Sequence, residues 1–139
     1  MDISVSKDFA VNSKSLKDVR DFAREVFDKS PIFSEQKDEL ILAIAEAAQN
    51  IVKHAYKDII ETKDVMQIKI SFKNNELTIG FYDKGKPAKP ENIKHRKLDD
   101  VKPGGLGTFF IKQIMDEVVF KEATGWRNHL VLTKNFNQQ

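Results

Sequence analysis

Two polar residues interrupt an apolar segment in the first half of the chain, and together they could orient a nucleophile and bind a cation. In the stretch EAAQN, Glu46 and Asn50 are four residues apart, which places them on one face of a helix, one turn from each other. A carboxylate followed one turn later by a carboxamide could orient water or a nucleophilic hydroxyl and ligate a hard cation such as Mg²⁺, which prefers oxygen ligands. The same pattern is more common at the solvated edge of an amphipathic helix, so the pair alone does not define a site.

A second candidate lies where a predicted strand ends, in the stretch IGFYDKGKP. Asp83 could accept a hydrogen bond from an exocyclic amine, and Gly85 would let a base or a backbone approach closely. The pattern D-x-G-x-P is also that of an ordinary turn from a strand into a loop. It therefore indicates a ligand site only in combination with other features.

The third candidate is the glycine run in PGGLGTFFIKQIMDEV, residues 103–118. Gly104, Gly105 and Gly107 open an amphipathic helix, where backbone N–H groups and the helix dipole can hold phosphate oxygens. No Gly-Lys-Ser/Thr follows, so this is not a Walker A loop. A long irregular segment precedes it in place of a strand, so it is not a Rossmann fingerprint either. By itself the run is a weak signal of phosphate binding.

Hydrophobic periodicity predicts the elements that must position these residues. It predicts helices over residues 16–27, 35–57 and 106–116. It predicts strands over residues 3–11, 65–73, 76–83, 118–123 and 129–136. The second helix has an apolar arc too wide for a surface helix, so we expect it to pack centrally against a sheet. Asn74 and Asn75 tolerate positive φ and predict a hairpin between the second and third strands. The segment 84–107 has little periodicity, and we expect it to form a lid.

The order of these elements does not alternate strictly between strand and helix, which disfavours a doubly wound parallel sheet. It favours an α/β two-layer sandwich, with a mixed, mostly antiparallel sheet covered on one face by three helices. The sequence contains no repeats and no low-complexity tract, so residues 1–139 are expected to form a single domain.

Composition narrows the function classes. The 23 basic and 21 acidic residues are spread along the chain and give a net charge of +2, which does not favour direct binding of nucleic acid. No apolar run approaches the roughly 20 residues of a membrane span, and no secretory signal is visible, so we expect no membrane partner and a cytoplasmic location. The chain has no cysteine, which excludes disulfides, thiolate metal sites and cysteine nucleophiles.

The three candidates in their order are far more specific than any one of them. The stretch EAAQNIVKHAY on a helix, DKGKP after a hairpin and GGLGTFFIKQIMDEV after a lid-like segment together resemble the Bergerat-fold ATPases of the GHKL superfamily. More narrowly, they resemble the bacterial anti-sigma factor serine/threonine protein kinases of partner-switching systems. The resemblance covers nearly the whole chain, including NHLVLTK near its end. It implies a histidine-kinase-like ATPase domain.

The resemblance implies a role for each candidate residue. Glu46 corresponds to the general base that takes the proton from an attacking serine, and Asn50 corresponds to the Mg²⁺ ligand that bridges to the phosphates. Asp83 would bind the adenine amine, and Gly85 would give the base room. The three glycines of the run would line the phosphates and close the lid. The implied cofactors are ATP or ADP and Mg²⁺.

The function implied by the resemblance is an ATP-binding anti-sigma factor with serine/threonine kinase activity. Such a protein would sequester a sigma factor and phosphorylate a serine of a small anti-anti-sigma antagonist, and family analogy implies a homodimer. The alternative is a nucleotide-gated protein-binding switch of the same fold, without kinase activity or with a partner other than a sigma factor.

Overall fold

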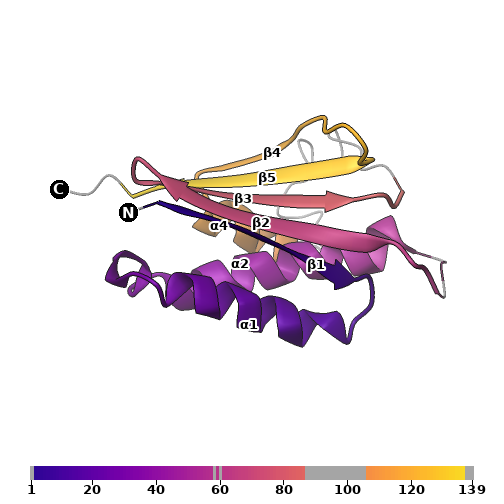
Figure 1. The fold of residues 1–139 in the computed structure, drawn as a ribbon, viewed down its shortest axis with the longest axis horizontal. Helices are drawn as coiled ribbons and strands as arrows, with labels where there is room; N and C mark the ends of the chain where they lie inside the picture. Colours follow the sequence, from indigo (N-terminus) through magenta and orange to yellow (C-terminus); the bar gives the residue numbers. More distant parts are fainter. Residues whose placement is uncertain (1, 58, 60, 87–105, 137–139) are drawn as a thin grey trace.

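The fold has two layers, a sheet and a set of helices that cover one of its faces (Figure 1). It is taken from a computed structural model, which describes residues 2–57, 59, 61–86 and 106–136. The longer helices are α1 (Ser15–Phe27), α2 (Lys37–Asn50) and α4 (Leu106–Ile114). The strands are β1 (Ile3–Ala10), β2 (Val65–Lys73), β3 (Glu76–Asp83), β4 (Glu117–Phe120) and β5 (Asn128–Asn135). The predicted α/β sandwich with three helices on one face is thereby confirmed.

The strand order across the sheet is β1-β2-β3-β5-β4, and every neighbouring pair of described strands is antiparallel. The sequence had suggested a mixed, mostly antiparallel sheet, but these strands include no parallel pair. Two of the pairings, β2 with β3 and β4 with β5, join strands that are consecutive in the chain, as antiparallel pairing allows. Because β5 lies beside β3, the last residue of β3, Asp83, is paired with the first residue of β5, Asn128.

The turn between β2 and β3 follows the prediction made from its two asparagines. Asn74 and Asn75 have φ values of 54° and 62°. Two consecutive residues with positive φ are what a type I′ turn needs, and this turn matches the right-handed twist of the strands that it joins. The strict alternation of buried and less buried residues along β2 then directs one side of the hairpin toward the helices.

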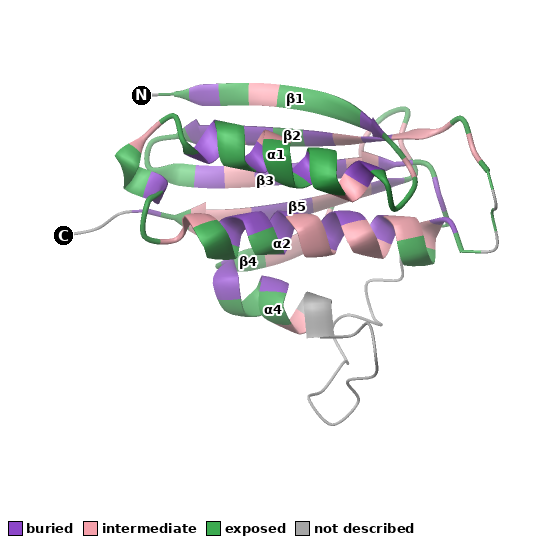
Figure 2. Ribbon diagram, turned by 90° about the horizontal axis from the view of Figure 1, so that it is seen from below, coloured by how far each residue is buried: buried purple, intermediate pink, exposed green. Residues whose placement is uncertain are grey.

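Helix α2 occupies the middle of the helical layer, between α1 and α4 (Figure 2). The expected central position is confirmed, because the apolar arc of α2 is buried and Leu40 and Ile44 are fully enclosed. The prediction of one α-helix over residues 35–57 is wrong at both ends. The α-helix begins at Lys37 and ends at Asn50, and the chain continues as a π-helix, η2 (Ile51–Ala55). A π-turn holds one more residue than an α-turn, and such turns occur frequently at functional sites.

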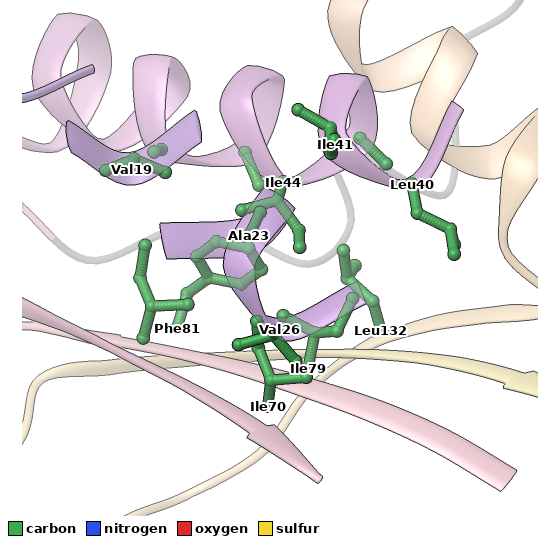
Figure 3. Packing of buried hydrophobic residues seen from close by; sticks show 14 of the residues in the cluster. Val19, Ala23, Val26, Leu40, Ile41, Ile44, Ile70, Ile79, Phe81 and Leu132 are labelled. Carbon is green, nitrogen blue, oxygen red and sulfur yellow. The ribbon is translucent and has the colours of Figure 1, made fainter. Parts of the chain in front are cut away.

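The core lies between the two layers. Figure 3 shows side chains of the two long helices and of the central strands meeting there: Val19, Ala23, Val26, Leu40, Ile41, Ile44, Ile70, Ile79, Phe81 and Leu132. No helix in the described part of the chain is long and apolar enough to cross a membrane.

A short 3₁₀ helix, η1 (Pro31–Phe33), contributes Phe33 to the core. Phe33 is fully buried, and its ring centroid lies 5.1 Å from that of Phe27 and 5.0 Å from that of Phe72. The ring of Phe136 lies 5.3 Å away on the chain that follows β5. The contacts with Phe72 and Phe136 are edge-to-face, and such contacts add to the hydrophobic gain of burying each ring. Phe33 therefore links the helix layer to the sheet.

Phe33→Ala is expected to lower the free energy of unfolding by about 3 to 5 kcal/mol, because it removes a buried ring and leaves a cavity among three others. The matched control is Ile32→Ala, since Ile32 is the preceding residue of the same short helix and is 38% exposed. Urea denaturation followed by circular dichroism measures both variants. Equal losses in the two would contradict the assigned role of Phe33.

Candidate functional site

The carboxylate of Asp83 is the most distinctive polar group of the core. Asp83 ends β3 and is 3% exposed, on the side of the sheet that the helices cover. Its Oδ1 accepts hydrogen bonds from the backbone N–H of Gly85 at 2.9 Å and from Nδ2 of Asn128 at 2.8 Å. Both hydrogen bonds that the described residues donate to this carboxylate go to Oδ1. The other oxygen, Oδ2, is therefore left to accept a hydrogen bond from a ligand.

The protonation of Asp83 reflects the same surroundings. Burial raises the pKa of this carboxyl above the ordinary value for aspartic acid, while the hydrogen bonds from Asn128 and Gly85 oppose the rise by stabilising the charged form. The negative charge of Asp64 adds to the rise. A buried carboxylate costs free energy unless its oxygens are satisfied, so this position suits a ligand that donates a hydrogen bond.

Asn128 is the residue of this site that the sequence prediction missed. It is 9% exposed, and its Nδ2 donates to the carbonyl oxygen of Lys86 at 3.0 Å as well as to Asp83. The signal in the sequence is a polar residue in a strand position that points toward the core, like Leu130 and Leu132 further along β5. That signal has meaning only when β5 is known to pair with β3.

Gly85 lies where the chain leaving β3 meets the π-helix η2. A Cβ on Gly85 would lie 2.5 Å from the carbonyl oxygen of Ala55 and 2.7 Å from the ring of Tyr56. The next residue, Lys86, donates its backbone N–H to the same Ala55 carbonyl at 2.6 Å. Since the last carbonyls of a helix have no partner within the helix, this hydrogen bond also satisfies the end of η2. The sequence predicted that a base or a backbone approaches Gly85 closely, and the backbone of Ala55 does so. The role of Gly85 beside a base stays a prediction.

Tyr56 holds the same turn from the other side. The side chain is buried, its hydroxyl donates to Oδ2 of Asp64 at 3.0 Å, and it accepts the backbone N–H of Lys84 at 3.2 Å. Burial raises the pKa of the Tyr56 hydroxyl, and the hydrogen bond to Asp64 raises it further. The phenol therefore keeps its proton at neutral pH and can donate and accept at once.

The structure describes both predicted residues of α2, Glu46 and Asn50, but only part of the predicted glycine run. Glu46 and Asn50 are half-buried residues at the end of α2, and Asn50 is the last residue before η2. The turn at Asp83 and the end of α2 are thus joined through the five residues of η2. Gly107 lies in the first turn of α4, which packs beside α2, whereas Gly104, Gly105 and most of the predicted lid over 84–107 lie outside the described residues.

Together the sheet, the helix layer and the buried aspartate at the end of β3 place the chain in a known class. The family described as histidine kinase-like ATPase domain matches residues 9–134, so the chain belongs to that family. Among characterised proteins it is similar to the serine-protein kinase RsbW of Staphylococcus aureus, in strains JH9 and Newman. The identity to each is 34% over 109 residues, which is 70% of this chain and 67% of each relative. The resemblance drawn from the three motifs is thereby confirmed.

Gly85→Ala is expected to destabilise the fold by about 1 to 3 kcal/mol, because the new Cβ would overlap the Ala55 carbonyl and force the turn away from η2. Gly80→Ala is the matched control, since the atoms nearest to a Cβ there belong to the side chains of His129 and Tyr82, at 3.3 Å, and not to the backbone. Urea denaturation gives both values. A Gly85 variant as stable as the parent chain would show that the approach to η2 is not tight in solution.

Proposed function

We propose that this chain is an ATP-dependent serine/threonine protein kinase that also acts as an anti-sigma factor, and that residues 1–139 form a single ATPase domain. The observation that carries the proposal is the buried carboxylate of Asp83, whose Oδ1 accepts two hydrogen bonds while Oδ2 accepts none from the described residues. Membership of a family of ATPase domains and similarity to proteins named serine-protein kinase support the same conclusion.

The chemistry of Asp83 favours adenine over other purines. Adenine carries an amine on C6, which can donate to a carboxylate oxygen such as Oδ2. Guanine and hypoxanthine carry a carbonyl oxygen at C6, which would face that carboxylate with no proton between them. A site that hydrogen-bonds one group rejects an analogue that lacks it, because its buried polar atom is then left unpaired.

The residues at the end of α2 fit a magnesium ion that arrives with the nucleotide. The carboxylate of Glu46 and the amide oxygen of Asn50 are hard oxygen donors, the type that Mg²⁺ prefers. Among the described residues there is no cluster of three or more histidine, cysteine, aspartate or glutamate side chains that could hold a metal ion. Mg²⁺ is usually bound through one or two protein ligands, phosphate oxygens and water. We propose Asn50 as the ligand.

In the proposed transfer, the chain positions the reactants and moves one proton. Glu46 accepts the proton of the substrate serine at its carboxylate while the serine oxygen bonds to the γ-phosphorus and ADP leaves. Bound Mg²⁺ would neutralise charge on the phosphates. The amino terminus of α4, with Gly107 in its first turn, would direct backbone N–H groups at phosphate oxygens.

The proposed protein partners are a sigma factor, which the chain would sequester, and a small anti-anti-sigma antagonist, which it would phosphorylate. We further propose a homodimer. A nucleotide-gated switch without kinase activity remains the second candidate, because it needs the same adenine site but not Glu46.

Asp83→Asn separates nucleotide binding from folding. The new amide can accept through its oxygen from Gly85 and Asn128, but its NH₂ group then replaces Oδ2 and faces the adenine amine. We expect ATP affinity to fall about 10- to 100-fold, since a hydrogen bond to a charged group contributes about 1.5 to 3 kcal/mol. Calorimetry measures the loss, with the exposed Asp8→Asn as control.

Asp83→Asn is also expected to change how the free energy of unfolding depends on pH. Because burial raises the pKa of Asp83 above its unfolded value, the folded protein holds this proton more tightly, and ionisation of Asp83 removes stability as the pH rises from about 4. Asp83→Asn is expected to lose that part of the profile and to be at least as stable as the parent chain at pH 7. Lower stability at pH 7 together with unchanged ATP binding would contradict the assigned role.

Labelled ATP and a purified candidate antagonist test the kinase step directly. The parent chain should form phosphoserine on the antagonist, and Glu46→Gln should reduce the rate about 100- to 10,000-fold while ATP still binds, because a general base contributes about that much. Asn50→Ala should lose Mg·ATP binding or transfer with the fold intact, and Glu25→Gln, an exposed change on α1, should have no effect. ATP binding by the parent chain without phosphoserine would favour the switch.

A further inference from the structure

We infer that the face of the sheet opposite the described helices carries a docking surface for an acidic segment of a partner protein (Figure 1). This surface, which we call the aromatic patch, lies where the end of β3 and the start of β5 meet the turn between β4 and β5. It combines three partly exposed rings with three exposed cations: Tyr82, Trp126, His129, Lys84, Lys121 and Arg127. The inference goes beyond the proposed function, because it requires neither nucleotide binding nor phosphoryl transfer.

The rings of the aromatic patch hold one another in place. Tyr82 and His129 are paired across β3 and β5, and their rings stack at 4.0 Å with an angle of 13°. Both side chains lean over Gly80, where a Cβ would lie 3.3 Å from each of them. The ring of Trp126 lies 5.7 Å from that of Tyr82. Because the rings are already packed together, a partner that covers them immobilises few free side chains, and the entropic cost of binding is low.

Trp126 is positioned by the turn between β4 and β5. Its backbone N–H donates to the carbonyl of Ala123 at 3.1 Å, and Gly125 supplies a φ of 87°. Nζ of Lys84 lies 5.4 Å from the centroid of the Trp126 ring, within reach of a cation–π interaction. Tryptophan, tyrosine and arginine are the residue types that most often dominate the binding energy of protein–protein interfaces. Their combination on one face therefore favours a protein as the occupant.

The cations around the rings favour an acidic occupant. Lys84 follows Tyr82 by two positions and Arg127 precedes His129 by two, so the alternation of side chains along a strand places both cations on the face of the rings. Lys121 lies beside His129, since its backbone N–H donates to the His129 carbonyl at 2.9 Å. The ion pairs among the described residues involve none of these three cations. Their charges are thus available to the carboxylates of a partner.

The carboxylates on the same face of the sheet lie mostly away from the aromatic patch. Asp8 is on β1, two strands from β3, and accepts a hydrogen bond from Gln67 at 3.0 Å. Glu76 and Glu117 lie toward the other end of the sheet, and Glu122 is the one acidic residue in the β4–β5 turn. A nucleic-acid strand running past the patch would bring its phosphates toward these carboxylates. A short acidic protein segment would not, so the charge pattern favours the protein.

The test uses the fluorescence of Trp126, which is the one tryptophan of the chain and lies in the patch itself. The full chain is titrated without nucleotide at pH 7.5 with a short synthetic peptide of glutamate and leucine. A peptide with lysine in place of glutamate and a short single-stranded DNA are titrated in the same way. The charge-reversal variants are Lys84→Glu and Arg127→Glu. The matched control is Lys73→Glu, an exposed change on the same face at the far end of β2. Circular dichroism confirms that each variant is folded.

We expect the glutamate peptide to change the Trp126 emission saturably, and the lysine peptide to leave it unchanged. Lys84→Glu and Arg127→Glu should each weaken binding of the glutamate peptide about tenfold, while Lys73→Glu binds it like the parent chain. No saturable change in the parent chain, or equal affinity in all three variants, would overturn the inference. Tighter binding of the DNA than of the glutamate peptide would also overturn it. Because no nucleotide is present, none of these results decides the proposed function.

Discussion

The site depends on one close approach, between the turn that follows β3 and the end of the helical layer. The Lys86 N–H lies 2.6 Å from the Ala55 carbonyl, and only a glycine at position 85 leaves room for it. This contact joins the sheet, which carries Asp83, to the π-helix that continues α2 beyond Asn50. Because both ends are held by hydrogen bonds and packing, the carboxylate and the end of α2 keep a fixed relation before any ligand binds. Such preorganisation lowers the cost of binding.

The antiparallel pairing of β3 with β5 supplies the other half of the site. It places Asn128 opposite Asp83, 45 positions away in the sequence, and so provides a neutral donor for a buried carboxylate. A positively charged partner would satisfy Asp83 more completely and would compete with a ligand for it. The amide stabilises the charged form while leaving Oδ2 for a ligand, which suits recognition of a neutral amine on a base. The architecture thus favours a nucleotide site over a structural ion pair.

The sequence predicted those features that depend on local chemistry and periodicity. The Asn74–Asn75 turn, the central apolar helix and the two-layer sandwich are of this kind, because side-chain spacing and backbone preference determine them. The change to a π-helix after Asn50 was not predictable, since it shifts the periodicity over only five residues. The partnership of Asp83 with Asn128 was not predictable either, because it depends on which strands become neighbours in the sheet. The predicted roles of Glu46 and of the glycine run remain predictions.

The central claim is that Asp83 recognises the amine of adenine at the junction of β3 and η2. The most direct measurement is a crystal structure of the chain with Mg²⁺ and a non-hydrolysable ATP analogue. We expect the amine nitrogen of adenine within hydrogen-bond distance of Asp83 Oδ2, with the hydrogen bonds of Gly85 and Asn128 to Oδ1 retained. An adenine ring bound elsewhere on the chain, or one that turns its amine away from Asp83, would contradict the account.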